Sequence, residues 1–165
     1  MPTGTTTRRP GSHPAKAFVV AAGRQLAELV PQIRAEPRVL GSILRVNRDT
    51  RFRRDPRPYK DHLDLWFWEG ERGQAVSGLF ARLTPEVLGV GAGDQLGGAT
   101  RKRPPVGLVD GGPAGRFLLH KALFVHRDEP ADERLQTDAV LATCMRHWRA
   151  LAPLHRWLTD NVQAS

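Results

Sequence analysis

Three short strand-like runs between residues 63 and 92 constrain the fold most, because only a few turn residues separate each run from the next. The run at 63–69 alternates, and its two sides are Leu63, Leu65 and Phe67 against His62, Asp64, Trp66 and Trp68. Further runs follow at 78–83 and 87–92, after turn residues at 70–74 and 84–85. Runs of this length and spacing predict an antiparallel sheet.

Helical periodicity lies on both sides of these runs. At 15–36, apolar residues recur every three or four positions, and Pro31 is expected to kink or split this helix. Its apolar stripe consists of Phe18, Ala22, Leu26, Leu29 and Ile33. A second helix is predicted at 132–150, where Asp132 can cap the first turn, and a third at 153–162. Their apolar residues include Leu135, Leu141, Met145 and Trp148, then Leu154, Trp157, Leu158 and Val162.

Two more predicted strands, at 43–47 and 122–127, complete the sheet. The expected class is α+β, with a single antiparallel sheet of about five strands and helices packed on one face. Residues 15–162 would form this one domain, after a disordered lead-in at 1–14. A long loop rich in glycine and proline is expected at 89–115, and it satisfies neither of the glycine patterns that bind phosphates.

The basic composition says little by itself. The formal net charge is +8, but 21 of the 25 basic residues are arginines, a bias that a GC-rich genome gives to almost any protein. No apolar run approaches the roughly 20 residues of a membrane span, and no secretory signal follows Arg8 and Arg9. The single cysteine, Cys144, is expected to be a buried thiol. Together these features predict a cytoplasmic protein with no membrane contact.

The positive charge is concentrated between residues 45 and 60. Seven cations stand there against two acids: Arg45, Arg48, Arg51, Arg53, Arg54, Arg57 and Lys60 against Asp49 and Asp55. Two X-Pro steps, at Pro56 and Pro58, exclude a regular helix. The segment is therefore predicted to be a charged loop.

Residues 45–62 read RVNRDTRFRRDPRPYKDH. This run resembles the signature of a bacterial family of conserved hypothetical proteins, domain of unknown function 2461 (DUF2461), which is close to R-x-x-R-D-T-R-F-S-K-D-K-x-P-Y-K-x-H. The matching residues are Arg45, Arg48, Asp49, Thr50, Arg51, Phe52, Asp55, Pro58, Tyr59, Lys60 and His62, whereas Arg53, Arg54 and Pro56 depart from it. Segments 83–93 and 153–158 are also similar, so the resemblance extends over about 15–162. It implies no activity and no cofactor.

An anion-binding site is the first hypothesis for this loop. A guanidinium group binds carboxylate or phosphate through two parallel hydrogen bonds, and the nearby acids are too few to neutralise all the arginines. We therefore expect a phosphorylated or carboxylated small molecule to bind here. The predicted ligand-binding residues are Arg45, Arg48, Asp49, Arg51, Tyr59, Lys60 and His62. The alternative is a structural network, in which Asp49, Asp55 and Asp61 pair with the arginines and only hold the loop.

Two other kinds of function stay open. A nucleic-acid binding module would use the loop's charge and the neighbouring aromatic residues to follow phosphates and stack bases. Those aromatic residues are Phe52, Tyr59, Trp66 and Trp68. Aromatic residues at strand spacing more often pack in the core, under helices. An interaction domain, whose 89–115 loop orders on a partner, is the other alternative.

Metal binding and catalysis have less support. His62 and Asp64 share a strand face and could be two metal ligands, but no further ligand motif accompanies them. Cys144 has His147 three positions on, although a helix interior does not activate a thiolate. We therefore expect no metal and no cofactor. The sequence assigns no catalytic residue and no oligomeric state, and it leaves open whether the protein is an enzyme.

Overall fold

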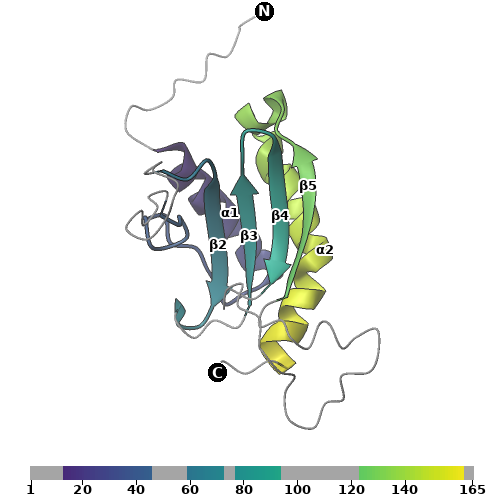
Figure 1. The fold of residues 1–165 in the computed structure, drawn as a ribbon. Coiled ribbons are helices and arrows are strands. Elements are labelled where there is room, and N and C mark those ends of the chain that lie inside the picture. The colour runs from purple at the N-terminus through teal and green to yellow at the C-terminus, as the bar shows by residue number, and fades with distance from the viewer. Residues whose placement is uncertain (1–12, 46–58, 73–76, 94–122, 162–165) are drawn as a thin grey trace, which may run out of the picture.

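The computed structural model of the chain describes residues 13–45, 59–72, 77–93 and 123–161. In chain order the elements are α1 (Pro14–Leu29), β1 (Ile33–Arg34), β2 (Leu63–Glu69), β3 (Gly78–Leu83), β4 (Val87–Gly93), β5 (Phe124–Pro130), the 3-10 helix η3 (Glu133–Gln136) and α2 (Ala139–Asn161). The strands form one sheet in the order β1-β2-β3-β4-β5, and neighbours are antiparallel. Helices α1 and α2 both lie behind this sheet in Figure 1. The predicted α+β class is confirmed.

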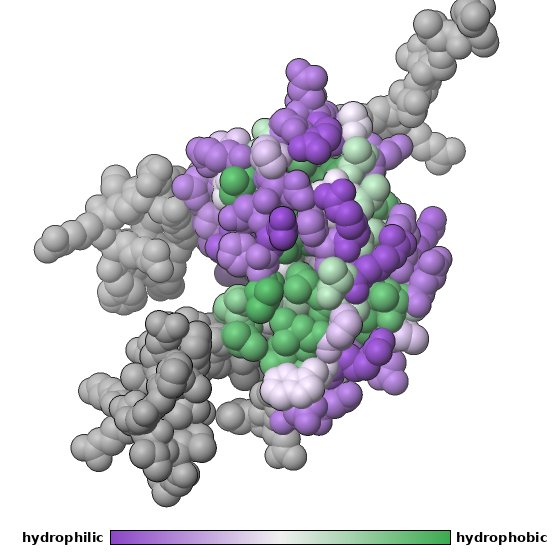
Figure 2. All heavy atoms as spheres, turned by 90° about the vertical axis from the view of Figure 1, so that its right-hand side faces the viewer, coloured by the Kyte–Doolittle hydropathy of each residue, from purple (hydrophilic) through white to green (hydrophobic). Residues whose placement is uncertain are grey.

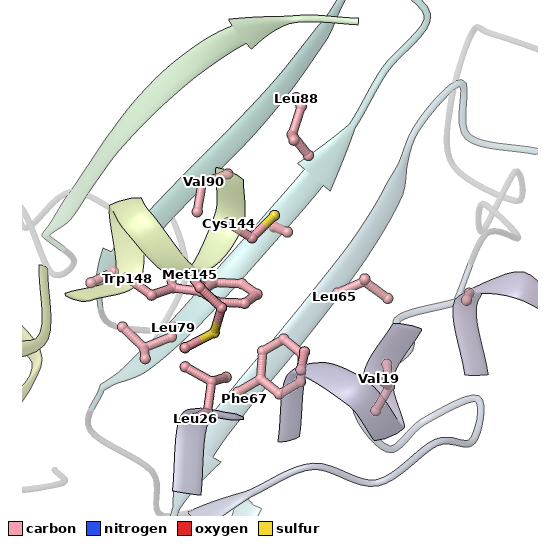
Figure 3. Packing of buried hydrophobic residues seen from close by; sticks show 14 of the residues in the cluster. Val19, Leu26, Leu65, Phe67, Leu79, Leu88, Val90, Cys144, Met145 and Trp148 are labelled. Atoms are coloured by element: carbon pink, nitrogen blue, oxygen red, sulfur yellow. The ribbon is translucent and has the colours of Figure 1, made fainter. Parts of the chain in front are cut away.

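The main core lies between the two helices and one face of the sheet. Alternate strand residues face it: Leu65 and Phe67 from β2, Leu79 and Ala81 from β3, and Leu88, Val90 and Ala92 from β4. Val19 and Leu26 from α1, and Cys144, Met145 and Trp148 from α2, close it from the other side (Figure 3). The rings of Phe67 and Trp148 meet edge to face at 5.2 Å. This packing buries the apolar side of every long central strand, which is the main stabilising contribution.

Strand β4 has a two-residue repeat that the sequence shows directly, VLGVGAG. Leu88, Val90 and Ala92 face the core, so the three glycines at 89, 91 and 93 fall on the opposite face. The strand predicted at 87–92 is therefore confirmed and one residue longer. The first glycines of the predicted 89–115 loop belong to this strand, and residues 94–115 lie outside the described part of the chain.

The first helix is shorter than predicted. It ends at Leu29, and Val30 already has extended backbone angles, φ −133° and ψ 92°. The residue before a proline avoids the helical region, so Pro31 ends the helix instead of kinking it. Ile33, predicted on the helical stripe, belongs instead to β1, where it pairs with Glu69 of β2.

The strand predicted at 43–47 is not formed in its described part. Ile43 makes only isolated bridges, to Val39 and to Leu65, and residues 46–47 lie outside the description. Two hydrogen bonds nevertheless hold this segment beside β2: Leu44 N donates to Asp64 O at 3.0 Å, and Trp66 N donates to Ser42 O at 2.9 Å. The turn before it includes Leu40 at a positive φ of 68°.

The C-terminal predictions need three corrections. Strand β5 begins and ends later than the predicted 122–127. Asp132 caps η3, by accepting from Arg134 N, and does not begin the long helix. The two predicted helices are one, because α2 runs through Pro153. Burial of Ala152 and Leu158 on either side of the proline holds both halves against the rest of the protein, although Trp157 is 56% exposed.

Strand β5 is the last strand of the sheet, and nearly all its residues are exposed. Viewed from that side, the molecule shows a hydrophobic area bordered by hydrophilic residues (Figure 2). Leu123, Phe124 and Val125 are among the exposed large hydrophobic residues of the protein. Among the described helices, none has both the length and the apolar character needed to cross a membrane.

Candidate ligand site

The second face of the sheet, defined as the face opposite α1 and α2, carries three rows of residues. The antiparallel register places residues of β2, β3, β4 and β5 side by side in each row. The rows are Asp64, Arg82, Gly89, Asp128; then Trp66, Phe80, Gly91, His126; then Trp68, Gly78, Gly93, Phe124. Polar residues therefore gather at one end of the face and aromatic residues at the other.

The glycines of β4 make room on this face in two different ways. At Gly91, the ring of Phe80 occupies the space that a Cβ would need. At Gly89, a Cβ would lie 3.1 Å from Asp128 Oδ1 and 3.9 Å from His126 Nδ1, and no ring fills that space. The face is therefore filled over Gly91 and hollow over Gly89.

A pocket of about 410 Å³ opens at this hollow. Its walls include the aromatic rings of Trp66, Phe80 and Phe124, and its polar groups come from Asp64, Arg82, His126 and Asp128. Phe80 stacks on Trp66 at 6.2 Å and meets Phe124 edge to face at 5.9 Å. The combination of aromatic walls with a few converging polar groups is typical of small-molecule sites.

Asp64 is the electrostatic centre of this face. Its carboxylate lies 2.6 Å from Arg82 Nε, 3.7 Å from Lys60 Nζ and 3.4 Å from His62 Nε2. The carboxylate is buried and accepts charge-assisted hydrogen bonds from Arg82, which are stronger than neutral ones. Asp61 lies 2.9 Å from His62 on the other side of that ring. Asp64 therefore brings Arg82, Lys60 and His62 together at the start of β2.

The structure describes four of the seven predicted ligand-binding residues. Lys60 and His62 come together at Asp64. Arg45 is the last described residue before 46–58 and Tyr59 is the first after it, and both are exposed. Arg48, Asp49 and Arg51 lie outside the described residues. Both ends of the charged loop adjoin the pocket, because Leu44 lines it at one end and Lys60 contacts its Asp64 at the other.

Sequence reasoning missed Arg82, His126 and Asp128. His126 Nδ1 and Asp128 Oδ1 are 3.1 Å apart, on the strand next to Gly89. Alternation along β3 and β5 would have placed all three on the second face, had β5 been assigned its true bounds. The tryptophans were considered as core under helices, but Trp66 and Trp68 form a separate buried cluster with Leu44 and Phe80.

A second polar cluster, also missed, lies at the other end of the sheet. His155 of α2 is fully buried, with Nδ1 2.9 Å from Ser77 Oγ and Nε2 2.8 Å from Glu69 Oε1. Burial lowers the pKa of His155, and its hydrogen bond to Glu69 opposes that shift only in part. Its imidazole is therefore neutral near pH 7. Because Ser77 is buried as well, the cluster is suited to holding α2 against the sheet.

Nucleophilic and metal chemistry find little support in the described residues. Cys144 is buried, and this burial raises the pKa of its thiol to about 12, as expected for a structural cysteine. His62 and Asp64 lie close together, yet the described part of the chain holds no group of three or more residues able to bind a metal ion.

The fold and the pocket define an α+β protein with one helix-covered sheet face and one face that carries a polar, aromatic-walled site. Residues 8–94, more than half of the chain, match the family of conserved hypothetical proteins DUF2461, and the chain belongs to this family. The match includes the charged loop and strands β2 to β4. No curated protein and no solved structure matches the chain.

Proposed function

We propose that this protein binds a small anionic molecule, with a phosphoryl or carboxyl group, in the pocket on the second face of the sheet. The observation that carries this proposal is the position of Arg82. Its guanidinium lines a pocket with aromatic walls and a floor at Gly89. Leu44, just before the Arg-rich loop, also lines this pocket, and Lys60, at the end of the loop, contacts its Asp64. The anionic group would lie near Arg82, and an apolar part of the ligand near Phe80 and Phe124.

Arg82 retains binding capacity although it pairs with Asp64. An arginine has five N–H donors, and here Nε and Nη2 donate to the carboxylate. The side chain is still 54% exposed. A ligand oxygen can therefore approach the rest of the guanidinium while Asp64 holds it in place.

Trp66 provides a readout of binding in this pocket. Within the described part of the chain, the Nε1 groups of Trp66 and Trp68 are buried and have no acceptor. A buried donor without a partner costs about 1–3 kcal/mol. The indole edge of Trp66 that carries this N–H lies over Gly78, and another part of the ring lines the pocket. Binding should then change tryptophan fluorescence.

The test compares two arginines on opposite faces of the same sheet. Phenyl phosphate and benzoate should raise the melting temperature of the parent protein, and uncharged phenol should not. Arg82→Gln and Gly89→Val, which fills the pocket floor, should lose the shift. Arg127→Gln on β5 should keep it, because that exposed arginine pairs with Val90 on the helix side. An equal shift for phenol, or a full shift in Gly89→Val, would exclude this pocket as an anion site.

The loop arginines need their own variant, because they lie outside the described residues. If the loop contributes to the site, Arg48→Ala with Arg51→Ala should weaken binding of phenyl phosphate and leave the parent melting temperature nearly unchanged. If the Arg/Asp network only holds the loop, the same variant should melt lower without a change in ligand affinity. Nucleic-acid binding is another alternative, and it predicts an affinity that falls steeply with salt.

A further inference from the structure

We propose that His126 is a second contact for the anion in the pocket on the second face of the sheet, and that it binds the anion only in its protonated form. This inference rests on the proposed function, because it concerns the same pocket. His126 lines that pocket from β5, and Arg82 lines it from β3. The site therefore combines one permanent cation with one cation that depends on pH.

Gly89 leaves open the space between these two side chains. Arg82 and Asp128 pair with Gly89 from the two neighbouring strands, so their backbones are two strand spacings, about 10 Å, apart. A Cβ at Gly89 would lie 3.9 Å from His126 Nδ1, so the imidazole reaches the hollow over the glycine. A ligand in this hollow would lie between Arg82 and His126.

Asp128 determines which nitrogen of His126 takes up a proton. Its Oδ1 lies 3.1 Å from Nδ1, and an ionised carboxylate only accepts hydrogen bonds, so Nδ1 carries the hydrogen of the neutral ring. Within the described part of the chain Nε2 has no partner, and the side chain is 51% exposed. Protonation therefore turns Nε2 from an acceptor, which repels an anion, into a charged donor, which binds one.

The charges around the pocket also favour an anion after that protonation. Two carboxylates of the described lining, Asp64 and Asp128, stand against the single guanidinium of Arg82, so negative charge is in excess while His126 is neutral. Strand β4 presents glycine on this face and adds no charge. A proton on His126 removes the excess. Two further titratable groups meet Asp64 from outside this lining: Lys60 and His62.

The experiment measures the affinity of the full chain for benzoate, by tryptophan fluorescence, at pH 8 and pH 6. Benzoate remains an anion at both values, whereas phenyl phosphate itself changes charge in this range. The parent should bind benzoate about tenfold more tightly at pH 6, because one charge-assisted hydrogen bond is added. His126→Gln should bind weakly at both values. His126→Lys, which is charged at both, should bind at pH 8 as tightly as the parent does at pH 6.

A control variant separates His126 from the other histidine near Asp64. His62→Gln should keep the tenfold rise. Equal affinity of the parent at pH 6 and pH 8, a rise that persists in His126→Gln, or a rise that is lost in His62→Gln would overturn this inference and leave binding through Arg82 intact. Absence of binding of both benzoate and phenyl phosphate at both pH values would overturn the proposed function as well.

Discussion

His155 in α2 and Glu69 at the end of β2 are 86 positions apart in the sequence, and their Nε2 and Oε1 atoms are 2.8 Å apart in the fold. A neutral imidazole satisfies both neighbours at once. Its Nε2–H donates to Glu69, and its Nδ1 accepts from the hydroxyl of Ser77. The C-terminal helix is therefore tied to the ends of two strands through one uncharged ring.

This arrangement predicts a loss of stability in mild acid. Burial lowers the pKa of folded His155 below its ordinary 6.5, so the unfolded chain binds a proton more readily than the folded one. The contribution of the neutral ring is fully present above about pH 6.5, the unfolded value, and is lost as the pH falls through the region below it. The free energy of unfolding, from urea denaturation, should decrease between pH 7.5 and pH 5.

Two variants assign that loss to His155. His155→Gln should lower the free energy of unfolding at pH 7.5 by about 1–3 kcal/mol, because it disturbs a buried hydrogen-bonded pair. It should also flatten the decrease toward pH 5. His126→Gln, at an exposed position of β5, should keep the decrease. An unchanged pH dependence in His155→Gln would mean that another group is responsible.

Asp64→Asn separates the two possible roles of the cations around it. The substitution removes the carboxylate that Arg82, Lys60 and His62 share. Because Arg82 is half exposed, we expect a loss of only about 1 kcal/mol in the free energy of unfolding. Affinity for phenyl phosphate, measured by tryptophan fluorescence, should rise several-fold, since the cations lose their internal counter-charge. A stability loss without any gain in affinity would favour the structural network.

Gly89 and Gly91, two glycines of β4 on the second face of the sheet, should differ in how well they tolerate a methyl group. Gly91→Ala would drive a Cβ into the ring of Phe80 and to 2.6 Å from the carbonyl oxygen of Val125. Overpacking of this kind costs about 1–3 kcal/mol. Gly89→Ala makes a tight contact only with the movable side chain of Asp128, at 3.1 Å, and should stay within about 0.5 kcal/mol of the parent. Equal effects, measured by urea denaturation, would contradict the hollow over Gly89.

The sequence was sufficient to predict the central sheet because β2, β3 and β4 carry a two-residue repeat bounded by turn residues. Leu63 and Glu69, the ends of β2, were predicted correctly for that reason. The errors lie where the local pattern is ambiguous. Pro31 can kink or end a helix, and only the pairing of Ile33 with Glu69 decides between them. Pro153 was predicted to begin a separate helix, but α2 continues through it, because burial on both sides of the proline outweighs its missing N–H.

The candidate site was predictable only in part. Charge density pointed to the region of Lys60 and His62, and these residues do come together. Their meeting point, Asp64, was considered only together with His62, and not as a partner of Arg82. Arg82 and His126 reach the site through strand register, a long-range relationship that a single sequence does not encode locally. The buried contact of His155 with Ser77 is of the same kind.

Cys144 offers the simplest measure of how completely the core is closed. Burial raises the pKa of its thiol to about 12, against an ordinary value of 9.0, so hardly any thiolate exists at pH 8 in the folded protein. Ellman's reagent should therefore react with it only in denaturant, and fast labelling of the native protein would contradict the packing around Met145 and Trp148.

The raised pKa of Cys144 also makes the free energy of unfolding depend on pH in the alkaline range. The unfolded thiol loses its proton first, so this contribution to stability is complete below about pH 9 and declines above it. Cys144→Ala should remove the decline and leave a small cavity, which costs stability without changing ligand binding.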